Sequence, residues 1–127
     1  MSISIDDFKK LEIKIGQILS AEKIDGSTRL LKLFVDMGEE NPRQVVSGIS
    51  VHFPEPDKLV GKKCAFASNL EPRSIMGFES QGMILAVSGI KPQDGSLEDS
   101  VDQKVLVEQF FSLLETGVDV PGGSIVK

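Results

Sequence analysis

The side chains best suited to chemistry in this chain gather in one stretch, residues 69–83, which reads NLEPRSIMGFESQGM. The stretch combines amide, hydroxyl and guanidinium groups with two methionines and two glycines, and it contains no histidine and no cysteine. Such groups exchange hydrogen bonds and pack against a ligand, but they do not form a nucleophile and general-base pair. The stretch therefore predicts a binding surface and not a catalytic centre.

The rest of the sequence is equally poor in catalytic groups. His52 is the only histidine, and beside Phe53 we expect it to be a loop or packing residue. Cys64 is the only cysteine, and because it alternates with Phe66 we expect a buried small apolar residue. This inventory falls short of the usual zinc ligand set, and no Walker-type phosphate loop or dinucleotide fingerprint is present. We therefore expect no metal, no cofactor and no enzymatic activity.

Four basic residues stand where a nucleic acid could reach them. They are Arg29 and Lys32 in the second predicted strand, Arg43 at the start of the third, and Arg73 in the stretch 69–83. Each could neutralise a phosphate and release counterions. The alternative, for each residue taken singly, is an ordinary solubilising charge.

The stretch 69–83 adds neutral polar and soft apolar groups. Asn69, Ser80 and Gln81 offer donors and acceptors suited to base edges, ribose hydroxyls or backbone. Met76 and Met83 offer apolar surface on which an unstacked base could rest. Because the chain contains no Tyr and no Trp, aromatic stacking is poorly supplied. This composition favours recognition of RNA shape over base-by-base readout.

The distribution of charge limits where a nucleic acid could bind. The net charge of -5 argues against a simple polybasic binder. Residues 1–90 carry 11 Lys and Arg against 12 Asp and Glu, whereas residues 91–127 carry 3 against 7. A nucleic-acid face must therefore be a local patch on the first ninety residues.

The apolar periodicity predicts the elements that position these groups. Alternating residues indicate five strands at about 11–24, 29–38, 43–50, 62–70 and 83–87, with a bulge or sharp curl at Gly16. A short helix is expected near residues 4–12, and a short helix or helical turn at 54–61. This order predicts an all-β, five-stranded Greek-key OB barrel with a short helix between strands 3 and 4. Periodicity alone leaves open another small β-barrel or a sandwich.

The length predicts a single domain, 1–127, with the barrel at about 11–90 and a C-terminal extension at about 91–127. Residues 104–115 are ambiguous between strand and helix.

No run of 18 apolar residues and no signal peptide is present, so we expect no membrane association. With a single cysteine, we expect a cytoplasmic location. Because the chain starts with Met1, we expect a free-standing protein or separate subunit, with an excised domain as the alternative.

Five sequence blocks, in one order, resemble a known family. They are DFKKLEIKIGQI (7–18), RLLKLFVDMG (29–38), VVSGI (45–49), LVGKK (59–63) and NLEPRSIMGFESQGM (69–83). Together they look like the tRNA-binding domain of structure-specific tRNA-binding proteins, also found as the C-terminal domain or beta subunit of methionyl-tRNA synthetases. The last block is the most specific of the five.

The resemblance implies an OB barrel that binds tRNA by its overall shape, in trans with a methionyl-tRNA synthetase or as part of one. Matched residue by residue, it implies tRNA contacts by Lys32, Asn69, Arg73, Ser80 and Met83, to which the residues themselves add Arg29 and Gln81. It also implies a homodimer formed through residues 103–127. The apolar residues available there are Val105, Val107, Phe110, Phe111, Leu113 and Leu114.

Two departures from the family pattern concern affinity. Many members carry a lysine where this chain has Glu71, and the stretch 94–108 is acidic.

A second function from another class is also open, because a related branch of the barrel family is an export-related chaperone that binds unfolded polypeptide. That branch lacks the SGI and SQGM pair that this sequence keeps. An enzyme is the third alternative.

Overall fold

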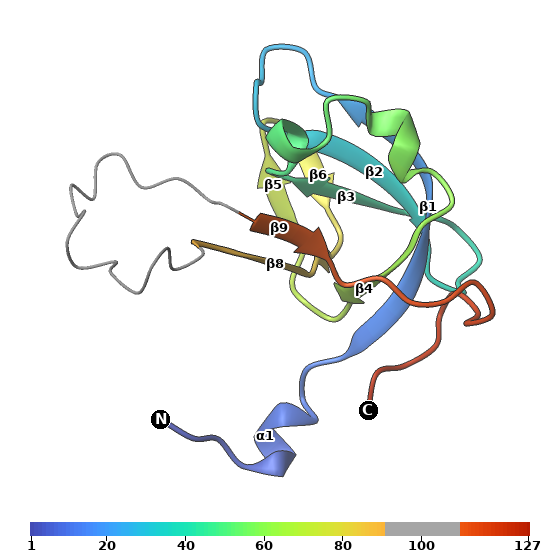
Figure 1. Cartoon of the computed structure of the whole chain (residues 1–127). Helices are drawn as coiled ribbons and strands as arrows, with labels where there is room; N and C mark the ends of the chain where they lie inside the picture. Colours follow the sequence, from blue (N-terminus) through green and yellow to red (C-terminus); the bar gives the residue numbers. More distant parts are fainter. Residues whose placement is uncertain (91–109) are drawn as a thin grey trace.

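The computed structural model describes residues 1–90 and 110–127, and its core is a strongly curled antiparallel sheet (Figure 1). The strand order is β3-β2-β1-β4-β7. The bounds are Ile13–Lys23 for β1, Leu31–Asp36 for β2, Arg43–Ser47 for β3, Lys63–Ala67 for β4 and Met83–Ile84 for β7. The sheet forms a nearly closed barrel, so the predicted all-β OB-like barrel is confirmed.

The inward faces of the strands fill the barrel. In β2 the buried residues alternate with half-buried ones, and Leu31, Leu33 and Val35 are completely buried. Phe66 of β4 is buried against them, and Leu59 belongs to the same core. Each such side chain contributes about 1.5–3 kcal/mol by leaving water. The apolar face predicted for the second strand is therefore confirmed.

Strand β1 is long and pairs with β2 on one side and β4 on the other. Its register against β2 shifts by one residue between Ile18 and Ser20. Gly16, where we predicted a bulge or curl, instead lies in regular register opposite Cys64. A Cβ at Gly16 would lie 2.5 Å from Val35 Cγ1, so this glycine permits close packing and the bulge forms beyond it.

Short helices stand where the sequence predicted them. Helix α1 spans Ile5–Phe8, and Ser4 Oγ caps it by accepting a hydrogen bond from the Asp7 amide at 3.0 Å. Two 3-10 turns, η1 (Ser50–His52) and η2 (Pro56–Leu59), lie between β3 and β4. The second turn places Leu59 in the core, which explains why an apolar residue ends it.

A small hairpin projects from the barrel in the stretch 69–83. It pairs β5 (Arg73–Ile75) with β6 (Phe78–Ser80) through the two-residue turn Met76-Gly77. Both turn residues have positive φ, 49° and 82°, as a tight hairpin of this kind requires. Glycine adopts this conformation freely, whereas Met76 holds it at a cost of about 1–2 kcal/mol.

The described part of the C-terminal extension folds back onto the barrel. The fifth predicted strand continues past β7 as β8 (Ala86–Gly89), which pairs with β9 (Phe110–Leu113). The chain then bonds to β4, where the Ala65 amide donates to the Leu114 carbonyl at 2.9 Å. It ends along β1, where the Ile15 amide donates to the Ser124 carbonyl at 2.8 Å. Leu113 is buried in the core, and the predicted interface residues Val105 and Val107 lie outside the described residues.

Candidate nucleic-acid interface

The stretch 69–83 is fixed at its first residue by a two-sided amide contact. Asn69 Oδ1 accepts a hydrogen bond from the Glu12 amide at 2.8 Å, and Asn69 Nδ2 donates to the Lys10 carbonyl at 2.7 Å. These bonds join the start of the stretch to the segment that leads from α1 into β1. The side chain of Asn69 therefore holds two chain segments together.

Ser80 and Gln81 fasten the other end of the stretch to β3. The Val46 amide donates to Ser80 Oγ at 3.0 Å, and Ser80 Oγ donates to the Gly82 carbonyl at 3.1 Å. The Gln44 amide donates to Gln81 Oε1 at 3.1 Å, and the Gln81 amide donates to the Gln44 carbonyl at 2.8 Å. Because β3 is the edge of the main sheet, these bonds satisfy backbone groups that would otherwise lack a partner strand.

Arg43 ties the turn after β2 to the same stretch. Its Nε and Nη2 each lie 2.7 Å from a carboxylate oxygen of Glu39, and its Nη1 donates to the carbonyls of Ser68 and Gln81. The hydrogen bond from Arg43 lowers the pKa of Glu39, with help from the positive charges of Arg43 and Lys14 and against the effect of burial. The same pairing raises the pKa of Arg43. The donors of the Arg43 guanidinium are therefore used in hydrogen bonds within the protein.

The outward side of the stretch is hollowed. A cavity of about 410 Å³ is lined by residues of the stretch, namely Leu70, Glu71, Pro72, Arg73, Ser80, Gly82 and Met83. Arg73 is exposed and has no ion pair within the parts of the chain that the structure describes, and Met83 is 43% exposed. Gly82 allows the wall to form, since a Cβ there would lie 3.2 Å from the Ala67 carbonyl oxygen. The hollow offers a cation, a carboxylate and an apolar wall.

Lys32 extends from β2 toward the hairpin. Its Nζ lies 4.8 Å from the ring centroid of Phe78 and 5.9 Å from that of Phe34, within cation–π range. The same ammonium lies 2.9 Å from a carboxylate oxygen of Glu22. Sequence reasoning missed Glu22, because only the register of β1 against β2 reveals that it faces Lys32.

The turn before β2 lies against the tip of the hairpin. A Cβ at Gly26 would lie 3.9 Å from Met76 Cε, and Arg29, shortly after the turn, is exposed. The structure thus gathers Lys32, Arg73 and Met83 around the hairpin, and no contact joins Arg29 to it among the described residues. Asn69, Ser80 and Gln81 lie in the same region, with their side chains bonded to the protein itself.

Other candidate chemistry is sparse in the described residues. Cys64 is buried, and burial together with the nearby carboxylate of Glu115 raises the pKa of its thiol to about 11. The ring of His52 stacks on that of Phe111, with centroids 3.9 Å apart. In residues 1–90 and 110–127 no cluster of His, Cys, Asp or Glu could hold a metal ion, and no helix is long and apolar enough to cross a membrane.

Comparison of the sequence with known proteins finds methionine–tRNA ligases. The chain is 51% identical over 84 residues to that of Methanocella arvoryzae, covering 66% of this chain. It is 38% identical over 125 residues to that of Lactococcus lactis, covering 98% of this chain. The matched regions span only 12% and 16% of these relatives.

Comparison of the structure gives a related result. A MetRS-related protein from Pyrococcus horikoshii matches with a TM-score of 0.79 and 33% identity, covering 100% of this chain and 99% of the other. The chaperone CsaA from Bacillus anthracis matches with a TM-score of 0.72 at 23% identity, which shows a shared fold. The sequence profile described as "Putative tRNA binding domain" matches residues 13–108. The chain therefore belongs to the putative tRNA-binding domain family.

Proposed function

We propose that this protein binds tRNA, without catalysing a reaction, on the surface around the β5–β6 hairpin. The observation that carries the proposal is the gathering of Lys32, Arg73 and Met83 around one hairpin in a domain of this family. Lys32, Arg73 and Arg29 contact phosphates, and Met83 packs against sugar or base. Asn69, Ser80 and Gln81 contribute mainly by shaping the surface, because their polar groups already hold backbone.

A small number of phosphate contacts has a predictable physical consequence. Binding is weak and falls steeply as salt rises, because each neutralised phosphate releases counterions. Without Tyr or Trp, stacking contributes little, and the protein distinguishes tRNAs poorly by sequence. The protein recognises the fold of tRNA in preference to its bases.

The partner enzyme that these relatives point to is a methionyl-tRNA synthetase. The domain acts either in trans with the enzyme or as part of it, in the cytoplasm, and raises the local concentration of tRNA at the catalytic domain. We propose further that the protein is a homodimer formed through residues 103–127. Phe110 and Leu114 are exposed there by 37% and 42%, whereas Leu113 is used by the barrel's own core.

A salt titration tests the proposed function. Gel-shift binding of a folded tRNA at two salt concentrations should give a dissociation constant that rises sharply with salt, and similar values for unrelated tRNAs. Binding that ignores salt, or the absence of a complex in dilute buffer, would overturn the proposal. Light scattering with and without tRNA measures the mass and decides whether the protein is a dimer.

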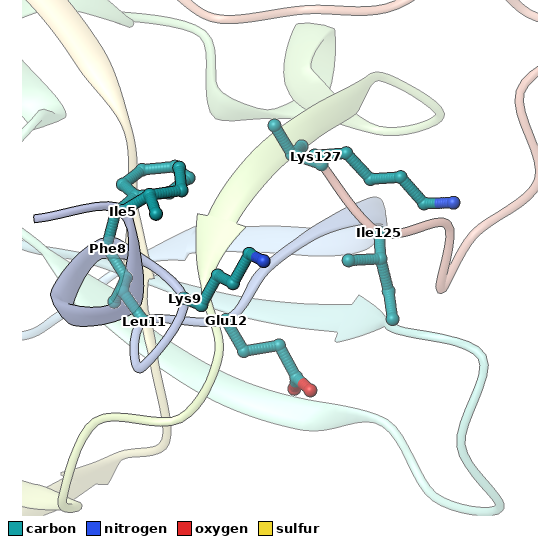
Figure 2. A pocket seen from close by; sticks show the side chains of 8 residues that line it. Ile5, Phe8, Lys9, Leu11, Glu12, Ile125 and Lys127 are labelled. Carbon is teal, nitrogen blue, oxygen red and sulfur yellow. The ribbon is translucent and has the colours of Figure 1, made fainter.

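A second function, capture of unfolded polypeptide, is favoured by one observation. A groove of about 370 Å³ lies between α1 and the C-terminal segment, and its apolar lining comes from Ile5, Phe8, Leu11, Ile125 and Val126. Figure 2 shows Ile5 and Phe8 on one side and Ile125 on the other. Competition between tRNA and an unfolded apolar peptide separates the two functions. Peptide binding that Ile125→Ser abolishes, with tRNA binding absent, would favour the second.

A further inference from the structure

We propose that Glu22 is a built-in competitor for the cation at Lys32, so that a tRNA phosphate must displace this carboxylate before Lys32 can bind it. The proposal rests on the proposed function and adds a residue that sets the affinity of the site. Glu22 lies outside the stretch 69–83, on β1, whereas Lys32 lies on β2. Its role follows from three features of its contact with Lys32.

The first feature is that the strand register fixes the pair. Glu22 of β1 stands directly opposite Lys32 of β2, and their charged atoms lie 2.9 Å apart. Opposite residues on one face of an antiparallel pair are held close by the backbone. The bulge between Ile18 and Ser20 creates this pairing, because an unshifted register would place the buried Ala21 opposite Lys32. The one-residue shift in register thus places the Glu22 carboxylate beside the Lys32 ammonium.

The second feature is the order in which an approaching polyanion meets the two charges. The Glu22 side chain is 60% exposed, whereas the Lys32 side chain is 20% exposed. The ammonium is also held over the rings of Phe78 and Phe34, which limits its movement away from the carboxylate. The Glu22 side chain is therefore the more accessible member of the pair, and a phosphate that binds the ammonium of Lys32 must take its place.

The third feature is that the contact can be exchanged, which a comparison with Arg43 makes clear. Arg43 donates to both oxygens of Glu39 and to two backbone carbonyls, so a phosphate would have to break a structural network. Lys32 has one carboxylate partner among the described residues and three donor hydrogens. Exchange of Glu22 for a phosphate leaves the barrel intact and restores a charge pair at Lys32.

Four variants test the proposal by gel shift with a folded tRNA at low salt. They are Glu22→Gln, Lys32→Ala, the double variant, and the matched control Glu40→Gln, which removes an exposed carboxylate in the turn between β2 and β3. Glu22→Gln should tighten binding about two- to fivefold, the range expected for one exposed ion pair. It should also lower the melting temperature slightly, because it removes that pair. Glu40→Gln should tighten binding less.

The double variant separates direct competition from general repulsion. In the Lys32→Ala background, Glu22→Gln should no longer tighten binding beyond the Glu40→Gln control. Equal effects of the two glutamine substitutions, or an unchanged effect of Glu22→Gln without Lys32, would overturn the competitor role while leaving tRNA binding intact. Failure of both wild type and Glu22→Gln to bind would refute the proposed function and this inference together. Binding by Glu22→Gln alone would support both.

Discussion

The candidate interface has two parts whose polar residues behave differently. At the junction, which we define as Asn69, Ser80 and Gln81, each side chain hydrogen bonds to backbone of a neighbouring segment. At the rim, defined as Arg29, Lys32, Arg73 and Met83, the side chains reach solvent to different degrees, and all but Arg29 lie at the hairpin. Residues of both parts were expected to contact tRNA.

The difference shows that residues of one sequence stretch, 69–83, can either hold the fold together or form its exposed surface. The junction gives the stretch 69–83 its shape by satisfying the edge of β3, and the rim supplies charge and apolar surface. Junction substitutions should therefore change the stability of the fold, and rim substitutions should change affinity. The predictions below test this separation, beginning with the largest expected effect.

The largest effect should come from Arg43, which braces the junction. Arg43→Ala should lower the free energy of unfolding by about 2–3 kcal/mol, because it leaves two carbonyls and a paired carboxylate without their charged donor. Urea denaturation measures this loss. Arg43→Lys is the control that keeps the charge but loses the forked geometry. Its free energy of unfolding should lie between those of the wild type and Arg43→Ala. A stable Arg43→Ala protein would show that the network contributes little.

Ser80→Ala should lower the free energy of unfolding by about 1–3 kcal/mol, because it leaves the buried Val46 amide without an acceptor. The matched control is Ser74→Ala, which removes an exposed hydroxyl from the neighbouring strand β5 and should be neutral. Thermal melts of both variants make the comparison. If Ser80→Ala melts like wild type yet loses tRNA, Ser80 belongs to the rim.

Arg73→Ala should behave in the opposite way. Its guanidinium is exposed and has no ion pair within the described residues, so stability should change by less than about 0.5 kcal/mol. Affinity for tRNA should fall, and the slope of log affinity against log salt should decrease by about 1. Salt-dependent gel shifts provide the measurement. Unchanged binding by both Arg73→Ala and Lys32→Ala would mean that the rim is misplaced.

The smallest effect concerns the acid stability of the Glu39–Arg43 pair. Because the folded protein lowers the pKa of Glu39 from 4.5, the pair stabilises the fold above pH 4.5 and loses this contribution as the pH falls through the lower, folded-state pKa. Denaturation curves between pH 6 and pH 3, at roughly half-unit steps, follow this loss. Glu39→Gln should flatten the acid limb of the profile.

Local patterns predicted the strands and turns because alternation and turn chemistry are local properties of the chain, and their order favoured the OB barrel over a sandwich. The apolar series Leu31, Leu33 and Val35 indicated which face of β2 is buried, and the turn residues located the second 3-10 turn but not the first. The bulge was misplaced at Gly16, because a glycine in a strand serves close packing as readily as it serves irregular backbone.

The division between junction and rim could not be predicted from sequence. Whether Ser80 points at a ligand or at the Val46 amide depends on how a hairpin docks against an edge strand 34 residues away. The pairing of Glu22 with Lys32 depends on a one-residue shift in register, and such a shift moves every later side chain to the other face. These facts belong to tertiary structure.

The return of the C-terminal segment along β1 has a consequence for how this barrel can be joined to other chains. The bridge between Lys14 and Ile125 places the beginning and the end of the barrel next to each other. Figure 1 shows both termini in the lower part of the view and the β5–β6 hairpin in the upper half, beside β3. A polypeptide joined at either terminus would therefore meet the barrel away from the hairpin, where we propose that tRNA binds.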